Sequence, residues 1–247
     1  MKKNGTAAVM ILAFVMISSL SWVYQQERGI SGVAGSGKNE EFSPVYRVRT
    51  DEKKVGLSFE AAWGCQGLEE ILTVLAEKKA GATFFVTGEW METYPEQAAS
   101  LLEAGMELGN GGPGLEEMEG LSLEECQRGL RETEERAESL GAGELRLFRP
   151  PLGGFDGNLL KTAAAMGYTT VLWSADTIDW KNYGAEAIFQ AAGGGRMESG
   201  SILRFRVGSK YTPQGLEMIL DRMEEEGYAA VSVSGLLEET GDQATSH

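Results

Sequence analysis

Three acidic side chains, Glu60, Asp176 and Asp179, stand where acid–base or metal chemistry could be placed. Glu60 ends the apolar run 55–60, and the two aspartates follow a second apolar run, 169–174. If these runs are parallel strands of a barrel, side chains at their carboxyl ends lie on the face that carries chemistry. Carboxylates there can act as general bases or bind a divalent cation.

Histidine and cysteine, the usual partners in such chemistry, are scarce. The chain has one histidine, His247, which is its last residue. The two cysteines, Cys65 and Cys126, are far apart and belong to no C-x-x-C pair, so the ligands are too few for a structural zinc site. We predict two partly buried free thiols, with a disulfide formed outside the cell as the alternative.

The elements that position the carboxylates follow an alternating pattern of short apolar runs and helical runs. We predict strands at 55–60, 82–88, 106–109, 145–148, 169–174, 201–207 and 229–233. Helices are predicted over 68–75, 95–104, 159–166, 185–192 and 213–226, and one more begins at Ser122. Seven strands separated by helices imply right-handed βαβ units, in a barrel or an open doubly wound sheet. No dinucleotide fingerprint or Walker motif follows the first strand, which removes the commonest reason to prefer the open sheet.

The composition bounds the domain count and the partners. A chain of 247 residues with 42% hydrophobic content can bury one full core. Its 37 acidic residues against 22 basic ones give a formal charge of −15. We therefore predict no nucleic-acid partner, because neutralising phosphates needs a basic face.

The two ends of the chain differ from the middle. Lys2 and Lys3 precede an uncharged, mostly apolar run over 5–24, which has the length of a membrane span. No small-x-small cleavage site follows it, so 1–24 is predicted to be a signal anchor, with a cleaved signal peptide as the alternative. Either interpretation exports the remainder. The Gly- and Ser-rich stretch 25–44 is predicted to be a flexible linker, 45–238 the folded domain, and 239–247 a disordered tail.

Six motifs across 45–237 occur in the order of one known family. They are 57–64 (Leu-Ser-Phe-Glu-Ala-Ala-Trp-Gly), 81–90, 104–110, 149–153 (Arg-Pro-Pro-Leu-Gly), 173–180 and 200–203. Together they resemble the polysaccharide deacetylases (NodB homology, carbohydrate esterase family four), and the first resembles the sporulation-associated branch, which has aspartate in place of Glu60. The resemblance implies a deformed seven-stranded (β/α) TIM-like barrel with a glycan groove across its strand ends.

The catalytic positions that the resemblance implies carry residues that do not match the family's catalytic residues. In the family, an aspartate acts as general base, two histidines bind a divalent metal such as zinc, and a late histidine protonates the leaving amine. These positions correspond to Glu60, Gly111, Leu115 and Arg206. Glycine and leucine offer no side-chain ligand, arginine stays protonated, and the extra methylene of Glu60 displaces its carboxylate by roughly an ångström. We expect no metal cofactor. The alternative is magnesium or calcium held by Glu60, Asp176 and Asp179.

Arginines stand where the family's metal chemistry is missing. Arg204 and Arg206 are two residues apart on one strand and therefore share a face, and we expect Arg149 to join them. Three guanidinium groups near Glu60 and the two aspartates would form an ion-pair network. Either it only neutralises charge in a relic pocket, or it holds an anion such as the carboxylate of a muramic acid or a peptide stem.

Several residues at the same strand ends are candidates for contact with a glycan. The predicted substrate-binding residues are Trp63, Pro151, Leu152, Trp180 and Arg204. Trp63, Trp173 and Trp180 could stack on sugar rings, although core packing is the alternative for each of them.

The sequence predicts a polysaccharide deacetylase-like protein of cell-wall carbohydrate metabolism that is catalytically inactive and binds glycan, peptidoglycan or a partner. It would be extracytoplasmic and membrane-anchored, or secreted after signal cleavage, and the branch resemblance implies sporulation. One alternative is an active hydrolase of N-acetyl amide bonds in peptidoglycan or chitin-like glycans that uses Glu60 with an atypical metal or none. A third possibility is an interaction scaffold with a closed pocket. The sequence makes no prediction of oligomeric state.

Overall fold

The computed structural model describes residues 42–194 and 197–238. The predicted signal segment (1–24), most of the predicted linker (25–44) and the predicted tail (239–247) lie outside the described residues. Within the described part of the chain, no helix combines the length and the apolar content needed to cross a membrane.

A curled parallel sheet forms the centre of the described domain. Its strands are β1 (Lys54–Ala61), β2 (Thr83–Val86), β3 (Glu107–Asn110), β4 (Leu147–Phe148), β5 (Thr169–Thr170), β6 (Ala175–Asp176), β7 (Ile202–Arg206) and β8 (Ala229–Val231). The order is β5-β4-β3-β2-β1-β7-β6, and β8 pairs with the first residues of β1. The two outermost strands, β5 and β6, belong to one short stretch of chain, 169–176, so the sheet curls round into a deformed barrel, as expected.

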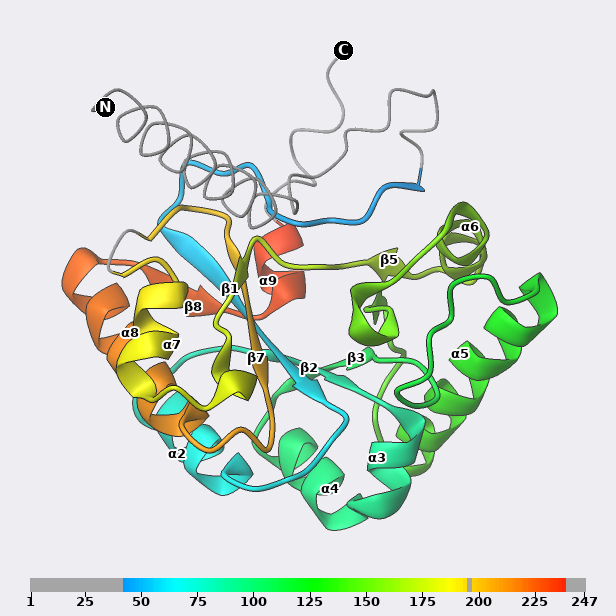
Figure 1. The fold of residues 1–247 in the computed structure, drawn as a ribbon, viewed down its shortest axis with the longest axis horizontal. Coiled ribbons are helices and arrows are strands. Elements are labelled where there is room, and N and C mark those ends of the chain that lie inside the picture. Colours follow the sequence, from blue (N-terminus) through cyan, green and yellow to red (C-terminus); the bar gives the residue numbers. More distant parts are fainter. Residues whose placement is uncertain (1–41, 195–196, 239–247) are drawn as a thin grey trace, which may run out of the picture. The chain divides into compact units, whose positions relative to one another are not determined.

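Helices cover the outer face of this sheet (Figure 1). They are α2 (Leu68–Glu77), α3 (Gly88–Thr93), α4 (Pro95–Glu103), α5 (Leu123–Ser139), α6 (Gly157–Ala165), α7 (Ala185–Ala191) and α8 (Thr212–Glu226). The last helix, α9 (Val233–Leu237), instead packs Val233 and Leu236 into an apolar cluster inside the barrel. Two 3₁₀ turns, η2 (Pro151–Gly153) and η3 (Asp179–Lys181), follow strand ends. Most connections are strand–helix–strand, which is the alternation that the sequence predicts.

Three predicted strands end at least two residues earlier than predicted. The strand predicted at 82–88 stops at Val86, because the Thr87 hydroxyl accepts the Trp90 backbone N–H and starts α3. The strand predicted at 229–233 stops at Val231, because Ser232 caps α9 in the same way. The run 169–174 does not form one strand: it pairs with β4 at its start, and the chain pairs with β7 only from Ala175 onward.

Side-chain alternation on β1 separates the core from the site. Residues 55–61 are all buried. Phe59 points to the outer, helix-covered face and stacks on Phe84 and Phe205, with ring centroids 4.7 and 5.0 Å away. Ser58 and Glu60 therefore point inward, because successive strand residues face opposite sides. A small apolar cluster that includes Phe85 and Val171 fills part of the interior, and the polar site lies at the strand ends.

Candidate functional site

The pairing of β1 with β7 fixes which side chains meet at the strand ends. In this register Ser58 lies opposite Arg204, and Glu60 lies opposite Arg206. Residues directly opposite each other on neighbouring strands share a face, so the two arginines and the glutamate are brought together on the inner face. The prediction that Arg204 and Arg206 point the same way agrees with this geometry.

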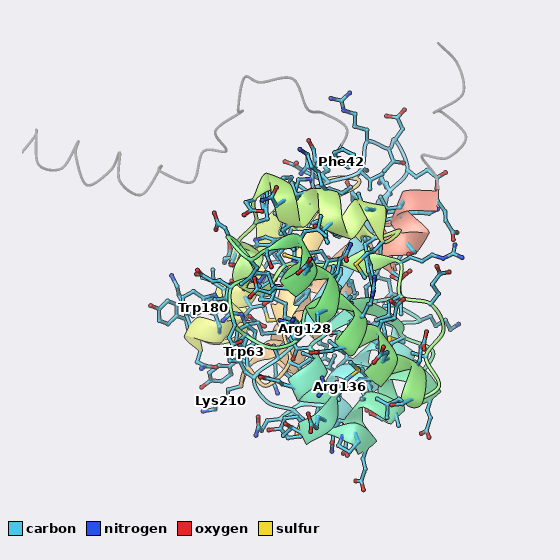
Figure 2. The ribbon with its side chains drawn as sticks, turned by 90° about the vertical axis from the view of Figure 1, so that its right-hand side faces the viewer. Phe42, Trp63, Arg128, Arg136, Trp180 and Lys210 are labelled. Carbon is cyan, nitrogen blue, oxygen red and sulfur yellow. The ribbon has the colours of Figure 1, made fainter. Side chains whose placement is uncertain are left out.

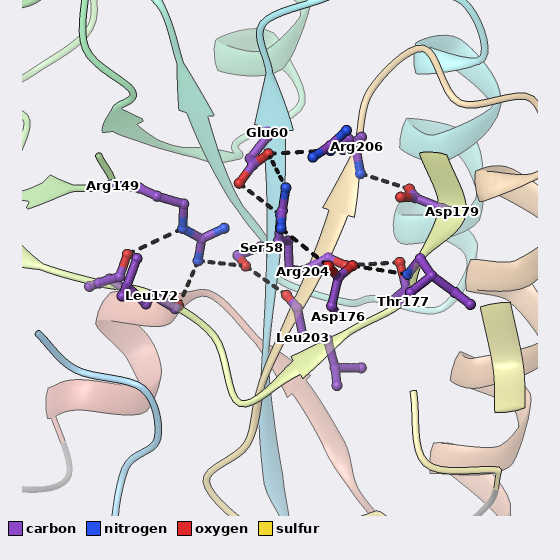
Figure 3. A network of polar contacts seen from close by, with 12 residues as sticks. Ser58, Glu60, Arg149, Leu172, Asp176, Thr177, Asp179, Leu203, Arg204 and Arg206 are labelled. Carbon is purple, nitrogen blue, oxygen red and sulfur yellow. Dashed lines mark hydrogen bonds and ion pairs between the residues drawn. The ribbon is translucent and has the colours of Figure 1, made fainter. Parts of the chain in front are cut away.

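Arg204 bridges two carboxylates (Figure 3). Its Nη2 donates to Glu60 Oε2 at 3.1 Å, and its Nη1 donates to Asp176 Oδ2 at 3.2 Å. Its Nε lies 2.9 Å from Glu60 Oε1 as an ion pair, although Nε makes no hydrogen bond. The Arg204 and Glu60 side chains are 6% and 9% exposed, so this pair is shielded from water, whereas Asp176 is 31% exposed.

Arg206 completes the ion pairs at the outer edge of the network. Its Nε lies 3.5 Å from Glu60 Oε2. Its guanidinium carbon lies 4.2 Å from the ring centroid of Trp63 and 5.2 Å from that of Trp180, within cation–π range. Burial lowers the pKa of Arg206, and the neighbouring charge of Arg204 lowers it further.

Arg149 lies beside this network but forms none of its ion pairs, which corrects the prediction. Its Nη2 donates to Ser58 Oγ and to the Leu172 carbonyl, both at 2.9 Å, and its Nε donates to the Val171 carbonyl at 3.2 Å. Because Arg149 follows β4, across the barrel from β7, backbone carbonyls are nearer to it than the carboxylates are. Burial lowers its pKa to about 9, so it remains protonated at neutral pH.

Asp179 also lies outside the ion pairs, contrary to the prediction. Its Oδ2 accepts the backbone N–H of Arg206 and the hydroxyl of Thr212, each at 2.7 Å. The side chain thus ties η3 to the end of β7 and the start of α8, and its role is to position these elements. Burial raises the pKa of Asp179.

A small pocket lies between Glu60 and Arg149 and is lined by both predicted ligand positions, Gly111 and Leu115. Its volume is about 20 Å³, enough for about one water molecule. Gly111 approaches β2 closely: a Cβ atom there would lie 2.9 Å from the Val86 carbonyl oxygen. A side chain at 111 therefore requires the backbone to shift.

The predicted substrate-binding residues divide between two places. Pro151 and Leu152 line the small pocket, together with Arg149 and Trp63. Trp63 and Trp180 line a larger groove of about 330 Å³ on the other side of Arg206. Arg204, also predicted to bind substrate, is buried and lines neither space.

Trp173 does not line either space. Its ring lies under Arg204, 4.0 Å from the guanidinium carbon, so it supports the network from within and offers no stacking surface in the groove.

Comparison with known proteins identifies the family. The family model described as polysaccharide deacetylase matches residues 47–171, slightly more than half of the chain. This chain belongs to the polysaccharide deacetylase family. The match includes the Glu60, Gly111, Leu115 and Arg149 positions and ends at Val171, before Asp176, Arg204 and Arg206.

Three relatives of this deacetylase-family chain illustrate its range. It is 31% identical to a peptidoglycan-N-acetylglucosamine deacetylase of Bacillus cereus, over 78% of this chain and 92% of that protein. It is 28% identical to the uncharacterised protein YlxY of Bacillus subtilis over 80% of this chain. The matched region spans only 61% of the length of YlxY.

The third relative is a solved structure, BA3943 of Bacillus anthracis, described as a CE4 family pseudoenzyme. It is 30% identical, with a TM-score of 0.76 over 80% of this chain and 70% of that one. A mutant of BA3943, described as having restored enzymatic activity, matches at 31% identity with the same TM-score, over 80% of this chain and 72% of that one.

The divalent metal that the family implies does not fit the residues present. Within the described ranges, no group of three or more His, Cys, Asp or Glu side chains is placed to hold a metal ion. The alternative oxygen-only site does not fit either, because the Arg204 guanidinium bridges Glu60 and Asp176 while Asp179 binds Thr212 and the Arg206 backbone.

Sequence reasoning missed three groups of this deacetylase-family site. Ser58 accepts from Arg149 and donates to the Leu203 carbonyl at 2.6 Å, and its position two residues before Glu60 is a signal that could have placed it on the inner face. Thr212 and the Leu172 carbonyl had no such signal, because only the three-dimensional fold brings them to Asp179 and Arg149.

The cysteines are both free, as the preferred interpretation predicts. Cys65 is half-buried and Cys126 is buried. Burial raises the pKa of the Cys126 thiol.

Proposed function

We propose that this chain binds a wall glycan through the deacetylase fold and does not hydrolyse its N-acetyl amide. The observation that carries the proposal is the Arg204 guanidinium, which contacts both Glu60 and Asp176. A cation fixed in this position competes with any metal for the two carboxylates.

Amide hydrolysis needs an activated water and a proton for the leaving amine. Both oxygens of Glu60 face guanidinium groups, from Arg204 and from Arg206, so the carboxylate is poorly placed to accept a proton from water. Arg206 stands at the proton-donor position of the family, and a guanidinium does not release a proton near neutral pH. The pocket beside Glu60 is also small, at about 20 Å³.

Binding is supported by the groove beside Arg206. It is bordered by Trp63 and Trp180, which are 40% and 44% exposed, and exposed aromatic faces can stack on sugar rings. Relatives named as peptidoglycan deacetylases support a peptidoglycan-type glycan as the ligand. The apolar run over 5–24 supports an extracytoplasmic site of action, with the run acting as a membrane anchor or as a cleaved signal.

The first test is acetate release by the full-length chain from N-acetylated chitin oligomers and from peptidoglycan, with zinc, cobalt, manganese or magnesium supplied. We expect no release above that of the Glu60→Gln variant, and we expect the chain to sediment with insoluble peptidoglycan. Metal-dependent release that disappears in Glu60→Gln would instead support the active hydrolase. If the chain neither releases acetate nor sediments with the glycan, an interaction scaffold is favoured.

A restoring variant tests whether the groove surrounds an inactive centre. The substitutions are Glu60→Asp, Gly111→His, Leu115→His and Arg206→His, made with and without Arg204→Leu. We expect zinc-dependent acetate release only when Arg204 is also replaced, because its guanidinium otherwise remains against the carboxylates. The BA3943 mutant described as having restored enzymatic activity supports the feasibility of this design.

A further inference from the structure

Arg206 presents a positioned cation to the groove. Its guanidinium is within cation–π range of the rings of both Trp63 and Trp180, and Glu60 Oε2 lies 3.5 Å from its Nε. Its two terminal nitrogens have no hydrogen-bond partner among the residues that the structure describes, although Arg206 lines the groove. The side chain is therefore held by its neighbours while its terminal donors remain available to a ligand.

The positive charges at this face are balanced by carboxylates, in a chain whose formal charge is −15, so an anion would be bound through the terminal donors of Arg206 that are unpaired within the described ranges. Arg149, Arg204 and Arg206 gather at this face with three carboxylates, Glu60, Asp176 and Asp179. Arg204 uses its guanidinium on Glu60 and Asp176. Arg149 donates from Nε and Nη2 to backbone carbonyls and a hydroxyl, and its Nη1 is buried without a hydrogen-bond partner among the described residues. Arg206 is the arginine of the three whose end lines the groove.

The groove has the size and the lining of a saccharide site. Its volume of about 330 Å³ is at the lower end of ligand pockets, which measure about 300–1,000 Å³. Gln66, Asn182 and Ser209 border it with amide and hydroxyl groups that can bind sugar hydroxyls. Trp63 and Trp180 lie at the same edge of the domain (Figure 2).

We propose that this groove binds a carboxylate carried by an amino-sugar residue of a wall glycan, with the terminal nitrogens of Arg206 donating to the two carboxylate oxygens. A planar guanidinium matches a carboxylate in this way, and the pair discriminates strongly against a neutral hydroxyl at the same position. The inference rests on the proposed glycan-binding function and narrows its ligand from glycans in general to acidic glycans.

The experiment measures binding of the full-length chain to four probes by titration calorimetry. The first probe is a peptide-free tetrasaccharide of alternating N-acetylglucosamine and N-acetylmuramic acid, whose lactyl carboxylates are free. The second is the same tetrasaccharide with its carboxylates reduced to alcohols. The third is chitotetraose, and the fourth is a free stem peptide, which separates a sugar carboxylate from a peptide carboxylate.

We expect the acidic tetrasaccharide to bind at least about tenfold more tightly than its reduced form or chitotetraose. Arg206→Gln should abolish that preference while it retains the weaker binding to chitotetraose. The matched control is Arg128→Gln, which removes the same charge from the exposed face of α5 and should preserve the preference.

Each other outcome overturns the inference in a recognisable way. Equal affinity for the acidic, reduced and neutral tetrasaccharides would support glycan binding but refute recognition of the carboxylate. If the stem peptide binds as tightly as the acidic tetrasaccharide, the recognised carboxylate belongs to the peptide, and the proposed sugar carboxylate is refuted. Binding to none of the four probes would also overturn the proposed function. If Arg206→Gln does not fold, Arg206→Lys replaces it, because lysine keeps the charge but lacks the planar two-nitrogen fork, so it should reduce the preference for the acidic tetrasaccharide.

Discussion

Replacing Arg204 by methionine should destabilise the domain far more than a typical arginine substitution does. The change leaves Glu60 as a buried carboxylate that has lost contacts at 2.9 and 3.1 Å. Removing one partner of a buried ion pair costs about 3–5 kcal/mol. The lower end applies here, because Arg206 still lies 3.5 Å from Glu60, and because Asp176, at 31% exposure, can be solvated by water.

The assay is equilibrium unfolding in urea, monitored by tryptophan fluorescence. With an m value of about 2 kcal/mol/M, a loss of about 3 kcal/mol lowers the unfolding midpoint by about 1.5 M. The double variant Glu60→Met with Arg204→Met should recover most of that loss, because replacing a whole buried pair by apolar side chains of similar volume is often neutral. The double-mutant cycle then gives a coupling energy of about 2–3 kcal/mol.

A matched surface pair supplies the control. Arg136 Nη2 lies 3.0 Å from Glu92 Oε2, but these side chains are 39% and 68% exposed. Arg136→Met should therefore cost less than about 1 kcal/mol. If Arg204→Met costs no more than Arg136→Met, or if the coupling to Glu60 is below about 0.5 kcal/mol, then the buried network does not stabilise the strand ends and the reasoning is refuted.

Other predictions concern the backbone, pH and thiols. Gly111→Ala should cost about 1–3 kcal/mol in urea unfolding, because its Cβ would meet the Val86 carbonyl, whereas Gly143→Ala, with nothing within 4 Å, should be near neutral. Burial raises the pKa of Asp179, so the folded protein binds a proton at this carboxylate at a higher pH than the unfolded chain does. Compared with Asp179→Asn, the wild type should therefore become more stable as the pH falls through that raised pKa toward about 3.9. Thermal unfolding of the two proteins across this pH range measures the difference. A thiol reagent should label half-buried Cys65 before buried Cys126, and equal rates would contradict the burial.

The fold could be predicted from the sequence because its signals are local and periodic. Apolar runs such as 55–60 and 201–207 appear in the structure as β1 and β7. The errors come from competing local signals: Thr87 and Ser232 are good N-cap residues that end the preceding strands, but each stands inside an apolar run that looked continuous. The split of 169–174 has no local cause, because it depends on which neighbouring strand each residue meets.

The sequence predicts which residues lie at the site better than it predicts their contacts. The period-two rule brought Arg204 and Arg206 to one face, and the register with β1 set Glu60 beside them. The partners of Arg149 and Asp179 could not be predicted, because they are backbone groups and hydroxyls from segments distant in sequence. Opposite formal charges near one another do not establish an ion pair when a buried carbonyl or N–H is closer.

The replacement of a metal by a guanidinium explains how the fold and the chemistry could separate. Glu60 needs a nearby cation whether or not the protein is an enzyme, because a buried carboxylate is costly without one. Arg204 provides that charge covalently, so the strand ends need no bound ion. A guanidinium has no open coordination position with which to polarise an amide or activate water, whereas a metal does. Under the proposed function, the same substitution favours the stability of the barrel and opposes catalysis, and the next arginine along the strand, Arg206, is left to contact a ligand in the groove.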